Sequence, residues 1–329
     1  MEFSDLARLA SGHVEARIVQ TAVQLGIFDI VGNNSLDARA IALSLGSDPR
    51  ATELLLNALV ALGLLEKQSD RFFLPAVSSK YLVKTSGQYY GDMILLDAAL
   101  WSCWEALAAA IRTGQPTRPP NMYQDDPQET ARFIRAMDSL VRARGDAEIL
   151  SRAIDWQNIT QLLDIGSGPG SYPIYLCRQF RQLRATIFDL PGTLKITELF
   201  VREAGLDERI KLLSGDYRTD AIPGTYEVIF LSNIIHGEGY HENERLIAKL
   251  SANLKASGRM VIKDHILDDS HARPPVGAVF SLLMLLTTQS GRCYAFAEVK
   301  AWLEKAGLRN VQEIQLPRPL TSSLIVAQK

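Results

Sequence analysis

Short apolar runs alternate with amphipathic segments over the second half of the chain. From residue 160 onward the runs have the length of buried strands, and the segments between them have helical spacing. The predicted strands lie at 162–163, 185–188, 210–213, 228–231, 260–263, 311–314 and 324–327. Strands that alternate with helices in this way are typical of a parallel sheet with helices on both faces. The pattern therefore predicts an α/β domain with a seven-stranded sheet over 151–329.

The first 87 residues have a different pattern, which predicts an all-helical winged-helix domain closed by a short hairpin. Helical spacing of apolar residues extends over 4–30, and two more helices are predicted over 35–45 and 49–65. The last of these begins with Asp48 and Pro49, a capping residue followed by a first-turn proline. The segment EKQSDRFFLP then predicts the hairpin.

A winged helix often binds DNA, but the charge of this domain argues against that function. Residues 1–85 contain 8 Lys/Arg and 9 Asp/Glu, and Glu53 lies beside Arg50 on the would-be recognition helix. A surface that contacts phosphates should be basic. The whole chain has a net charge of −2. We therefore expect no nucleic acid and no anionic membrane as partner.

The segment 88–150 is predicted to hold further helices and to bridge the two domains. No Pro/Gly-rich linker separates it from 151–329. Its large apolar residues, which include Trp101 and Met137, have helical spacing, and such residues most often belong to a core.

The stretch QLLDIGSGPG at 161–170 ends the first predicted strand with three glycines at alternate positions. Gly166, Gly168 and Gly170 allow positive φ and a close approach of a flat ligand to the backbone. The following SYPIYLCRQF has helical spacing, so the turn opens the N-terminus of a helix. A purely structural turn remains the alternative for this feature taken alone.

Acidic residues follow the next two predicted strands. Asp189 lies 23 residues after Gly166, where a carboxylate can bind two ribose hydroxyls. Asp216 and Tyr217 offer a carboxylate and an aromatic ring for the amine and the face of an adenine. The turn contains no Lys or Arg, and Ser171 stands where a dinucleotide-binding fold normally has Gly or Ala. These features predict an adenosine-containing ligand without phosphates.

These motifs resemble the class I S-adenosylmethionine-dependent methyltransferases, and among them the small-molecule O-methyltransferases of plants and bacteria. The matching motifs are DIGSGPG, DLP from Asp189, GDY from Gly215 and SNIIHGEG from Ser232. The resemblance covers nearly the whole chain and implies a Rossmann-like catalytic domain, S-adenosylmethionine as cofactor, no metal, and a homodimer formed by residues 1–87. The cofactor-binding residues that it implies are Asp164, Gly166, Gly168, Asp189, Leu190, Gly215, Asp216, Tyr217, Ser232 and Asn233.

His236 follows the fourth predicted strand and is the candidate general base. Methyl transfer from a sulfonium is an in-line displacement, and the acceptor hydroxyl must lose its proton to be a good nucleophile. A phenol titrates near ~10 and an imidazole near ~6.5, so a positioned histidine suits this task at neutral pH. The alternative is an ordinary loop histidine. The other four histidines have no comparable placement and are expected to be structural or exposed: His13, His241, His265 and His271.

The sequence departs from the family around this histidine. Where the family has His-Asp-Trp this chain has His-Gly-Glu, which ends at Glu238, and Ser232 replaces a basic residue four positions before His236. Of two carboxylates that steady the histidine in the family, Asp264 matches the first, whereas Cys293 occupies the position of the second. We predict that Asp264 or Glu238 orients His236.

The most apolar segment, 274–288, predicts a buried helix that is too short to span a bilayer. Phe280 and Met284 in this helix are candidate contacts for the methyl acceptor. The resemblance adds Trp101 and Met137, on helices that roof the acceptor cavity. Such side chains favour a flat aromatic acceptor, for example a phenol, a polyketide or a quinone-like ring.

The spacing of the cysteines and the N-terminal sequence bear on the metal content and the cellular location of the protein. Cys103, Cys177 and Cys293 form no Cys-x-x-Cys pair, which argues against a metal site or a disulfide framework. The N-terminus lacks the features of a signal peptide. We expect a cytoplasmic protein.

Three functions remain open at this point. The leading one is an O-methyltransferase for a small aromatic molecule. The second uses the same cofactor site for C-methylation, other chemistry or binding alone, and the altered residues around His236 keep it open. The third is a nicotinamide-dependent dehydrogenase or a DNA-binding regulator, and the missing phosphate-loop pattern and the acidic N-terminal domain count against it.

Overall fold

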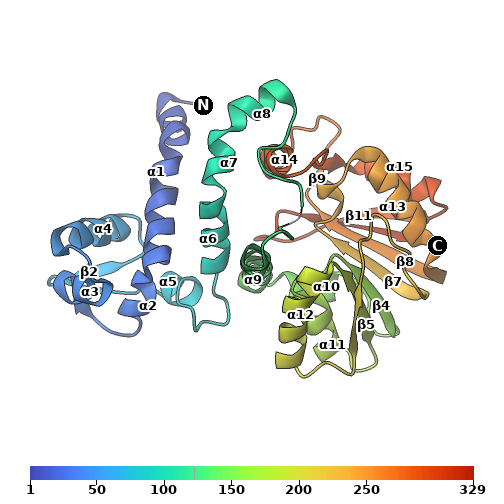
Figure 1. Cartoon of the computed structure of the whole chain (residues 1–329), viewed down its shortest axis with the longest axis horizontal. Coiled ribbons are helices and arrows are strands. Elements are labelled where there is room, and N and C mark those ends of the chain that lie inside the picture. The colour runs from blue at the N-terminus through green and yellow to red at the C-terminus, as the bar shows by residue number, and fades with distance from the viewer. Residues whose placement is uncertain (122) are drawn as a thin grey trace. The chain divides into compact units, whose positions relative to one another are not determined.

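The computed structural model describes residues 1–121 and 123–329, which form two compact units, Met1–Trp101 and Ser102–Lys329 (Figure 1). Each unit has a hydrophobic core of its own. The division falls inside the segment 88–150 that the sequence assigns to bridging helices. The domain boundaries after 87 and after 150 stay predictions.

The first unit is mostly helical and carries a small sheet. Its helices are α1 (Phe3–Leu25), α2 (Ile27–Val31), α3 (Ala38–Leu45), α4 (Pro49–Ala61), α5 (Ala76–Tyr81) and α6 (Gly91–Ala99). Its strands are β1 (Leu36–Asp37), β2 (Glu66–Gln68) and β3 (Arg71–Phe73), in the order β1-β3-β2. The antiparallel pair β2–β3 is the predicted hairpin. Phe28, Leu56 and Phe72 form the centre of the core.

Three predicted helix boundaries in this unit are wrong, for local reasons. The helix predicted over 49–65 ends at Ala61, just before Gly63 with its φ of +72°. The helix predicted over 4–30 is interrupted at Gly26, whose φ of +73° ends α1 before α2 begins. The helix predicted over 35–45 begins only after Asp37, because this carboxylate accepts the Ala40 N–H at 2.8 Å and caps the helix.

The second unit is a sheet with helices on both faces. Its helices are α7 (Trp101–Glu105, which begins at the last residue of the first unit), α8 (Leu107–Thr113), α9 (Pro127–Arg144), α10 (Asp146–Ala153), α11 (Ser171–Gln179), α12 (Pro191–Glu203), the short 3-10 helix η1 (Ile235–Gly237), α13 (Tyr240–Ala252), α14 (Pro275–Thr287) and α15 (Phe296–Lys305). Its strands are β4 (Gln161–Ile165), β5 (Arg184–Asp189), β6 (Ile210–Ser214), β7 (Tyr226–Ser232), β8 (Leu254–Asp264), β9 (Ile266–Leu267), β10 (Tyr294–Ala295), β11 (Arg309–Gln315) and β12 (Ser323–Gln328).

All seven predicted strands belong to one sheet, in the order β11-β12-β8-β7-β4-β5-β6. The α/β fold class is thus confirmed. The expectation of a wholly parallel sheet is wrong at one edge, because β12 runs antiparallel to both β8 and β11. No helix lies between β11 and β12, and strands joined without a crossover helix run in opposite directions.

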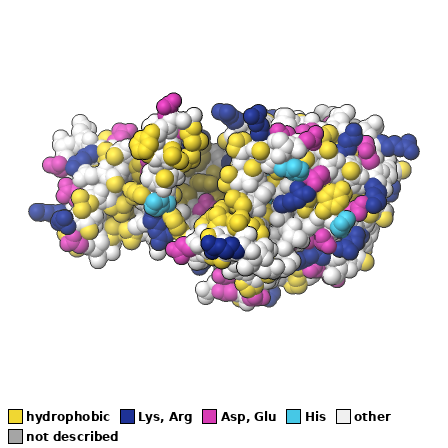
Figure 2. Space-filling view, turned by 90° about the horizontal axis from the view of Figure 1, so that it is seen from above, with side chains coloured by type: hydrophobic (Ala, Val, Ile, Leu, Met, Phe, Trp, Pro, Cys, Tyr) yellow, Lys and Arg dark blue, Asp and Glu magenta, His cyan; other side chains and the backbone are white. Residues whose placement is uncertain are grey.

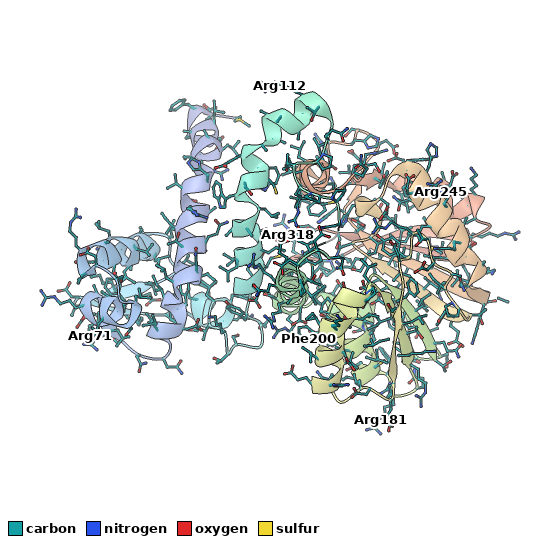
Figure 3. The ribbon with its side chains drawn as sticks, viewed as in Figure 1. Arg71, Arg112, Arg181, Phe200, Arg245 and Arg318 are labelled. Carbon is teal, nitrogen blue, oxygen red and sulfur yellow. The ribbon has the colours of Figure 1, made fainter. Side chains whose placement is uncertain are left out.

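Successive residues of the central strands alternate between two cores, one on each face of the sheet. Ile229 and Leu231 pack on the face covered by α13 and α15, and Val228 and Phe230 pack on the face covered by α10 and α11. Arg245, on α13, is exposed and lies on the outside of this unit (Figure 3).

Helix α14 forms where the apolar segment predicts it, but it is only partly buried in the single chain. Met284 and Leu286 are buried, whereas the side chain of Val279 is 59% exposed. Among the described residues, no helix has both the length and the apolar character needed to cross a membrane.

The parallel strands end at one edge of the sheet, and this edge positions the candidate site. β4 ends at the glycine turn, β5 ends at Asp189, and β6 ends just before Asp216. Ser232 and Lys263 are paired at the ends of β7 and β8. Ligands of open α/β sheets bind outside the carboxyl ends of the strands.

Candidate active site

The glycine turn after β4 needs glycine for both conformation and space. Gly166, Gly168 and Gly170 have φ values of +60°, +60° and +76°, in the left-handed region that side chains disfavour. A Cβ at Gly166 would also lie 2.5 Å from Cδ1 of Ile234. The left-handed backbone therefore favours glycine at all three positions, and a side chain at Gly166 would require Ile234 to move.

Two buried carboxylates flank this turn. Asp189 accepts the backbone N–H groups of Gly168 and Leu190 at 2.8 and 2.7 Å. Burial raises the pKa of Asp189 to about 6, although these bonds oppose the shift. Burial also raises the pKa of Asp164 to about 8, while the Ser167 hydroxyl donates to its Oδ2 at 2.6 Å. Oδ1 of Asp164 has no hydrogen-bond partner among the described residues.

The GDY motif forms a compact turn after β6. A Cβ at Gly215 would lie 2.4 Å from Cζ of Phe188, so only glycine fits there. Oδ1 of Asp216 accepts the backbone N–H and the Nε–H of Arg218 at 2.9 and 3.1 Å. Tyr217 is buried, and its ring lies in the same core as β4 and β7.

Ser232 and Asn233 lie at the end of β7. Asn233 has a φ of +58°, and its backbone N–H donates to the Lys263 carbonyl at 2.8 Å. Its side-chain amide donates to the Ser232 hydroxyl at 3.3 Å. The turn after Asn233 brings the chain into η1, which carries His236.

His236 is paired with a carboxylate of the neighbouring strand. Its Nδ1 lies 2.7 Å from Oδ1 of Asp264, a side chain that is only 1% exposed. Burial alone would raise the pKa of Asp264, but His236 and His265 hold it below its usual value. An ionised Asp264 accepts a hydrogen bond from an Nδ1 that carries a proton. In a neutral His236 the other ring nitrogen, Nε2, then has a free lone pair.

Glu238, the other predicted partner of His236, binds elsewhere. Its Oε1 accepts the Tyr217 hydroxyl at 2.7 Å, and its carbonyl accepts the Tyr294 hydroxyl at 2.6 Å. Burial raises the pKa of the Glu238 carboxyl. Of the two alternatives that the sequence left open, the geometry brings Asp264 and not Glu238 to the ring of His236.

Of the four candidate acceptor contacts, Phe280 lies beside the candidate base. Its ring meets the ring of His236 edge-on, with centroids 4.9 Å apart at 81°. Met284 is buried one turn further along α14, and Met137 is half-buried on α9. Trp101 belongs to the first unit, where its indole N–H donates to Gln20 at 2.6 Å.

Two groups near the site were not predicted. His265 donates its backbone N–H to Asp264 at 2.7 Å, and its Nδ1 lies 3.1 Å from the Thr321 carbonyl. Its position next to Asp264 was a signal available in the sequence. The other group joins Arg144 and Asp146 to Lys263, and its only sequence signal was a lysine in the apolar strand MVIKD.

The three cysteines are free and buried. Cys293, at the position where the family has a second carboxylate, carries a thiol instead. Burial and the charge of Asp264 raise the pKa of the Cys293 thiol to about 12. Cys293 therefore lies near the pair of His236 and Asp264 but stays neutral. Among the described residues, no group of His, Cys, Asp and Glu has the arrangement of a metal site.

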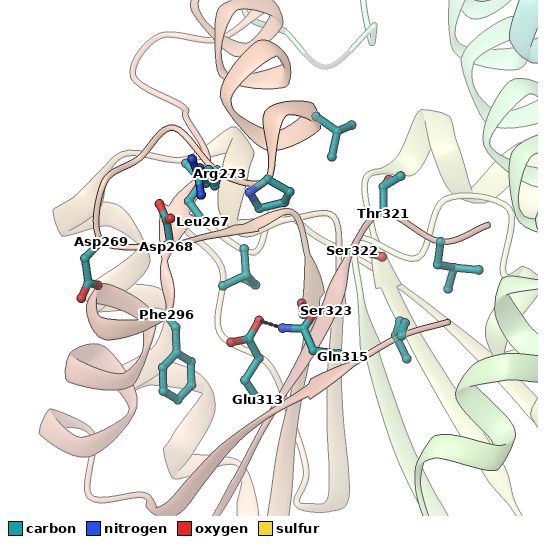
Figure 4. A pocket seen from close by; sticks show the side chains of 15 residues that line it. Leu267, Asp268, Asp269, Arg273, Phe296, Glu313, Gln315, Thr321, Ser322 and Ser323 are labelled. Carbon is teal, nitrogen blue, oxygen red and sulfur yellow. Dashed lines mark hydrogen bonds between the residues drawn. The ribbon is translucent and has the colours of Figure 1, made fainter. Parts of the chain in front are cut away.

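A cavity of about 560 Å³ opens beside the hairpin of β11 and β12 (Figure 4). Gln315 donates to Glu313 at 2.7 Å inside it, and Arg273 and Ser322 line other parts of its wall. None of the predicted cofactor or catalytic residues lines this cavity. It is therefore distinct from the candidate active site.

Family models cover most of the chain. An O-methyltransferase domain matches residues 104–309, and an O-methyltransferase dimerisation domain matches residues 7–84.

Two curated relatives match nearly end to end. The chain is 29% identical to 3-hydroxy-5-methyl-1-naphthoate 3-O-methyltransferase of Streptomyces sahachiroi, over 98% of this chain and 94% of that protein. It is 26% identical to the N,N-dimethyltransferase OxyT of Streptomyces rimosus, over 98% of this chain and 96% of that protein.

Solved structures share the fold over the whole length. PigF with SAH has a TM-score of 0.90 at 25% identity and covers 100% of both chains. Human N-acetylserotonin methyltransferase in complex with SAM also has a TM-score of 0.90, at 22% identity, over 99% of this chain and 97% of that one.

Proposed function

The chain belongs to the S-adenosylmethionine-dependent O-methyltransferase family, and from this premise we propose that it methylates a hydroxyl of a small aromatic, polyketide-like acceptor with His236 as general base. The observation that carries the proposal is the pair of His236 and Asp264 at the carboxyl ends of neighbouring strands, with 2.7 Å between Nδ1 and Oδ1. Membership of this family argues against the nicotinamide-dependent alternative.

The residues around the glycine turn fit S-adenosylmethionine. Oδ1 of Asp164 is buried without a partner among the described residues and can bond to a polar group of the cofactor. The carboxylates of Asp189 and Asp216 suit ribose hydroxyls and the adenine amine. The turn contains no cation for a phosphate. When bound, S-adenosylmethionine supplies a methyl group activated by the positive charge on its sulfur.

The residues of the chain then act on the acceptor and its proton. His236 takes the hydroxyl proton on Nε2, and Asp264 stabilises the imidazolium that results. Phe280 limits the space beside His236, so the acceptor oxygen is held near Nε2. The proton leaves His236 to solvent after the methyl ether has formed.

Apolar side chains are proposed to contact the acceptor and indicate its class. Phe280 has a flat ring, and Met284 and Met137 have flexible apolar side chains. Such side chains suit the binding of an aromatic ring. The name of the relative from Streptomyces sahachiroi includes a hydroxylated naphthoate. A hydroxylated polycyclic carboxylate or phenol is therefore the acceptor class to test first.

A homodimer follows from the dimerisation domain, and we place its surface on α1. This helix buries only residues near its C-terminal end, Gln20, Ala22 and Val23. Apolar side chains of its first half are exposed, and hydrophobic side chains gather where this helix begins (Figure 2): Phe3 84%, Leu6 56%, Leu9 60% and Val14 49%.

The experiment that tests this function compares wild type with His236→Gln. Wild type is incubated with S-adenosylmethionine and a panel of hydroxylated naphthoates, phenols and aromatic amines, because one relative is named an N,N-dimethyltransferase. We expect ether formation by wild type and a fall of roughly 10²-fold or more in the variant. The affinity for S-adenosylhomocysteine, measured by calorimetry, should not change.

Two outcomes would contradict the proposal separately. Undiminished ether formation by His236→Gln would remove the general-base role. If wild type methylates amines but no hydroxyl, the assignment of O-methylation is wrong, whereas the assignment of S-adenosylmethionine as cofactor stands.

A further inference from the structure

A second histidine, His265, lies beside the proposed base and has no part in the proposed mechanism. It directly follows Asp264 in the chain, and its backbone N–H donates to Oδ1 of Asp264 at 2.7 Å. The same oxygen lies 2.7 Å from Nδ1 of His236. One carboxylate oxygen thus contacts the ring of His236 and the backbone of His265, which places the two histidines close together.

The ring of Phe280 contacts the imidazoles of both histidines. Its centroid lies 4.9 Å from the centroid of His236 and 4.9 Å from that of His265, at interplanar angles of 81° and 52°. Gly277, one turn earlier on α14, brings the helix close to the second histidine, because a Cβ there would lie 3.6 Å from Cβ of His265. His265 therefore lies under the face of α14 that carries the candidate acceptor contacts Phe280 and Met284.

The surroundings of His265 determine its charge and its tautomer. Burial lowers the pKa of His265, and this shift exceeds the opposing effect of Asp264. The ring is therefore neutral at neutral pH. Its Nδ1 lies 3.1 Å from the Thr321 carbonyl, which can only accept a hydrogen bond, so Nδ1 carries the proton. The other ring nitrogen, Nε2, then has a lone pair and can only accept.

Nε2 of His265 has no hydrogen-bond partner among the described residues. The side chain is half-buried, as are those of His236 and Phe280, so all three rings have surface open to a ligand. The site therefore presents two nitrogens that accept hydrogen bonds, Nε2 of His236 and Nε2 of His265, next to one aromatic ring.

A structural role explains only half of this imidazole. The bond from Nδ1 to the Thr321 carbonyl ties the end of β8 to the segment before β12. A shorter amide side chain could make that bond without a second polar atom beside Phe280. An acceptor atom that is partly removed from water and has no partner in the chain favours a ligand that supplies a donor.

We propose that Nε2 of His265 accepts a hydrogen bond from a second hydroxyl of the aromatic acceptor, while His236 takes the proton of the hydroxyl that is methylated. A ring system with two hydroxyls offers one donor to each nitrogen, and its flat face can pack on Phe280. An acceptor without the second hydroxyl, or with a methyl ether in its place, has no donor for His265. His265 is thus a specificity-determining residue. The inference rests on the proposed O-methylation and extends it to the substitution pattern of the acceptor.

The test uses acceptors that differ only in the second group. These are the positional isomers of dihydroxynaphthalene, the naphthols that lack one hydroxyl, and the methoxynaphthols in which a methyl group masks it. Initial rates with S-adenosylmethionine give kcat and KM, and the diol with the highest kcat/KM defines the matched set. We expect wild type to prefer this diol over its naphthol by roughly 5- to 20-fold in kcat/KM, the size of one hydrogen bond. The methoxynaphthol should be a poorer acceptor than the naphthol.

Two substitutions separate the acceptor contact from the structural bond. The amide nitrogen of His265→Asn takes the place of Nδ1, so this variant keeps the bond to Thr321 and loses the group at the position of Nε2. The longer His265→Gln brings an amide oxygen to the position of Nε2 and loses the bond to Thr321. We expect His265→Asn to reduce the preference for the diol to about 2-fold or less, through a higher KM for the diol. His265→Gln should keep at least about half of the preference.

His241→Asn is the matched control, because it removes an imidazole whose side chain is 81% exposed on α13. It should leave the preference unchanged. If His265→Gln does not fold, His265→Asn decides the outcome.

The results that would overturn the inference differ from those that would overturn the proposed function. Equal kcat/KM of wild type for the diol and the naphthol would refute the role of His265 and leave O-methylation in place. Loss of the preference in His265→Gln with retention in His265→Asn would assign His265 a structural role alone. If wild type methylates no hydroxyl of either acceptor, the proposed function is wrong and the inference falls with it.

Discussion

The bond between His236 and Asp264 determines which ring nitrogen is available to the acceptor. Asp264→Asn replaces the carboxylate oxygen beside Nδ1 by an amide that can donate a hydrogen bond to Nδ1. The ring proton of His236 then moves to Nε2. We expect turnover to fall by roughly 10²- to 10⁴-fold, with unchanged affinity for S-adenosylhomocysteine. Steady-state rates and calorimetry measure the two quantities.

Glu238→Gln is the matched control for that substitution, since Glu238 was the rival partner of His236. Its amide oxygen can still accept the Tyr217 hydroxyl, which Oε1 now accepts at 2.7 Å. We expect less than about a 5-fold change in turnover, far below the loss of a general base. A larger fall with Glu238→Gln than with Asp264→Asn would reverse the assignment.

Asp164 makes the stability of the protein depend on pH. Its pKa in the folded protein is about 8, because burial raises it, whereas an unfolded aspartate titrates near ~3.9. Between these values the folded chain keeps a proton that the unfolded chain releases, so stability falls as pH rises from about 4 to about 8.

Asp164→Asn should remove this part of the pH dependence. Urea unfolding at pH 5 and pH 8 measures it, and we expect wild type to lose on the order of 2–4 kcal/mol more than the variant between these values. An equal loss in both proteins would show that Asp164 is ionised in the folded state at neutral pH.

In the glycine turn, both the positive φ and the lack of space for a side chain favour glycine at Gly166. Gly166→Ala forces a side chain into a left-handed position and toward Cδ1 of Ile234, 2.5 Å away. We expect a cost of about 1–2 kcal/mol in stability from the backbone and a loss of at least about 10-fold in affinity for S-adenosylhomocysteine.

Gly205→Ala separates the two causes, because Gly205 also has a positive φ, of +67°, but nothing lies within 4 Å of an added Cβ. It should show the same kind of stability cost in urea unfolding and leave cofactor affinity unchanged. If both variants bound the cofactor as wild type does, the turn would not be the binding element.

At the scale of the whole molecule, α1 is expected to hold two subunits together. Leu6→Glu combined with Leu9→Glu places four charges in a two-fold interface that each leucine would otherwise stabilise by about 1.5–3 kcal/mol. We expect monomers at micromolar concentration in analytical ultracentrifugation.

Leu43→Glu is the control, since Leu43 is 85% exposed on α3, away from the apolar positions of α1. It should leave the dimer intact. Dissociation by Leu43→Glu, or none by the α1 substitutions, would place the interface elsewhere.

What the sequence by itself determined is local or follows from strand order. Alternation of apolar runs and helices predicted all seven strands, and motifs at strand ends predicted that Asp189, Asp216 and His236 share one edge of the sheet. This works because the carboxyl ends of parallel strands meet at a common edge, whatever the loops do. The left-handed glycines could likewise be read from residue type alone.

What only the tertiary structure decided depends on the direction of side chains and on contacts between distant segments. Glu238 is two residues from His236 in sequence, yet Asp264, on the next strand, reaches its Nδ1. The ion pairs of Asp146 with Arg144 and Lys263 join the end of α9 and the start of α10 to the end of β8, more than a hundred residues later. Spacing in the sequence carries no signal for such pairs, because packing of the sheet against α9 and α10 is what brings them within bonding distance.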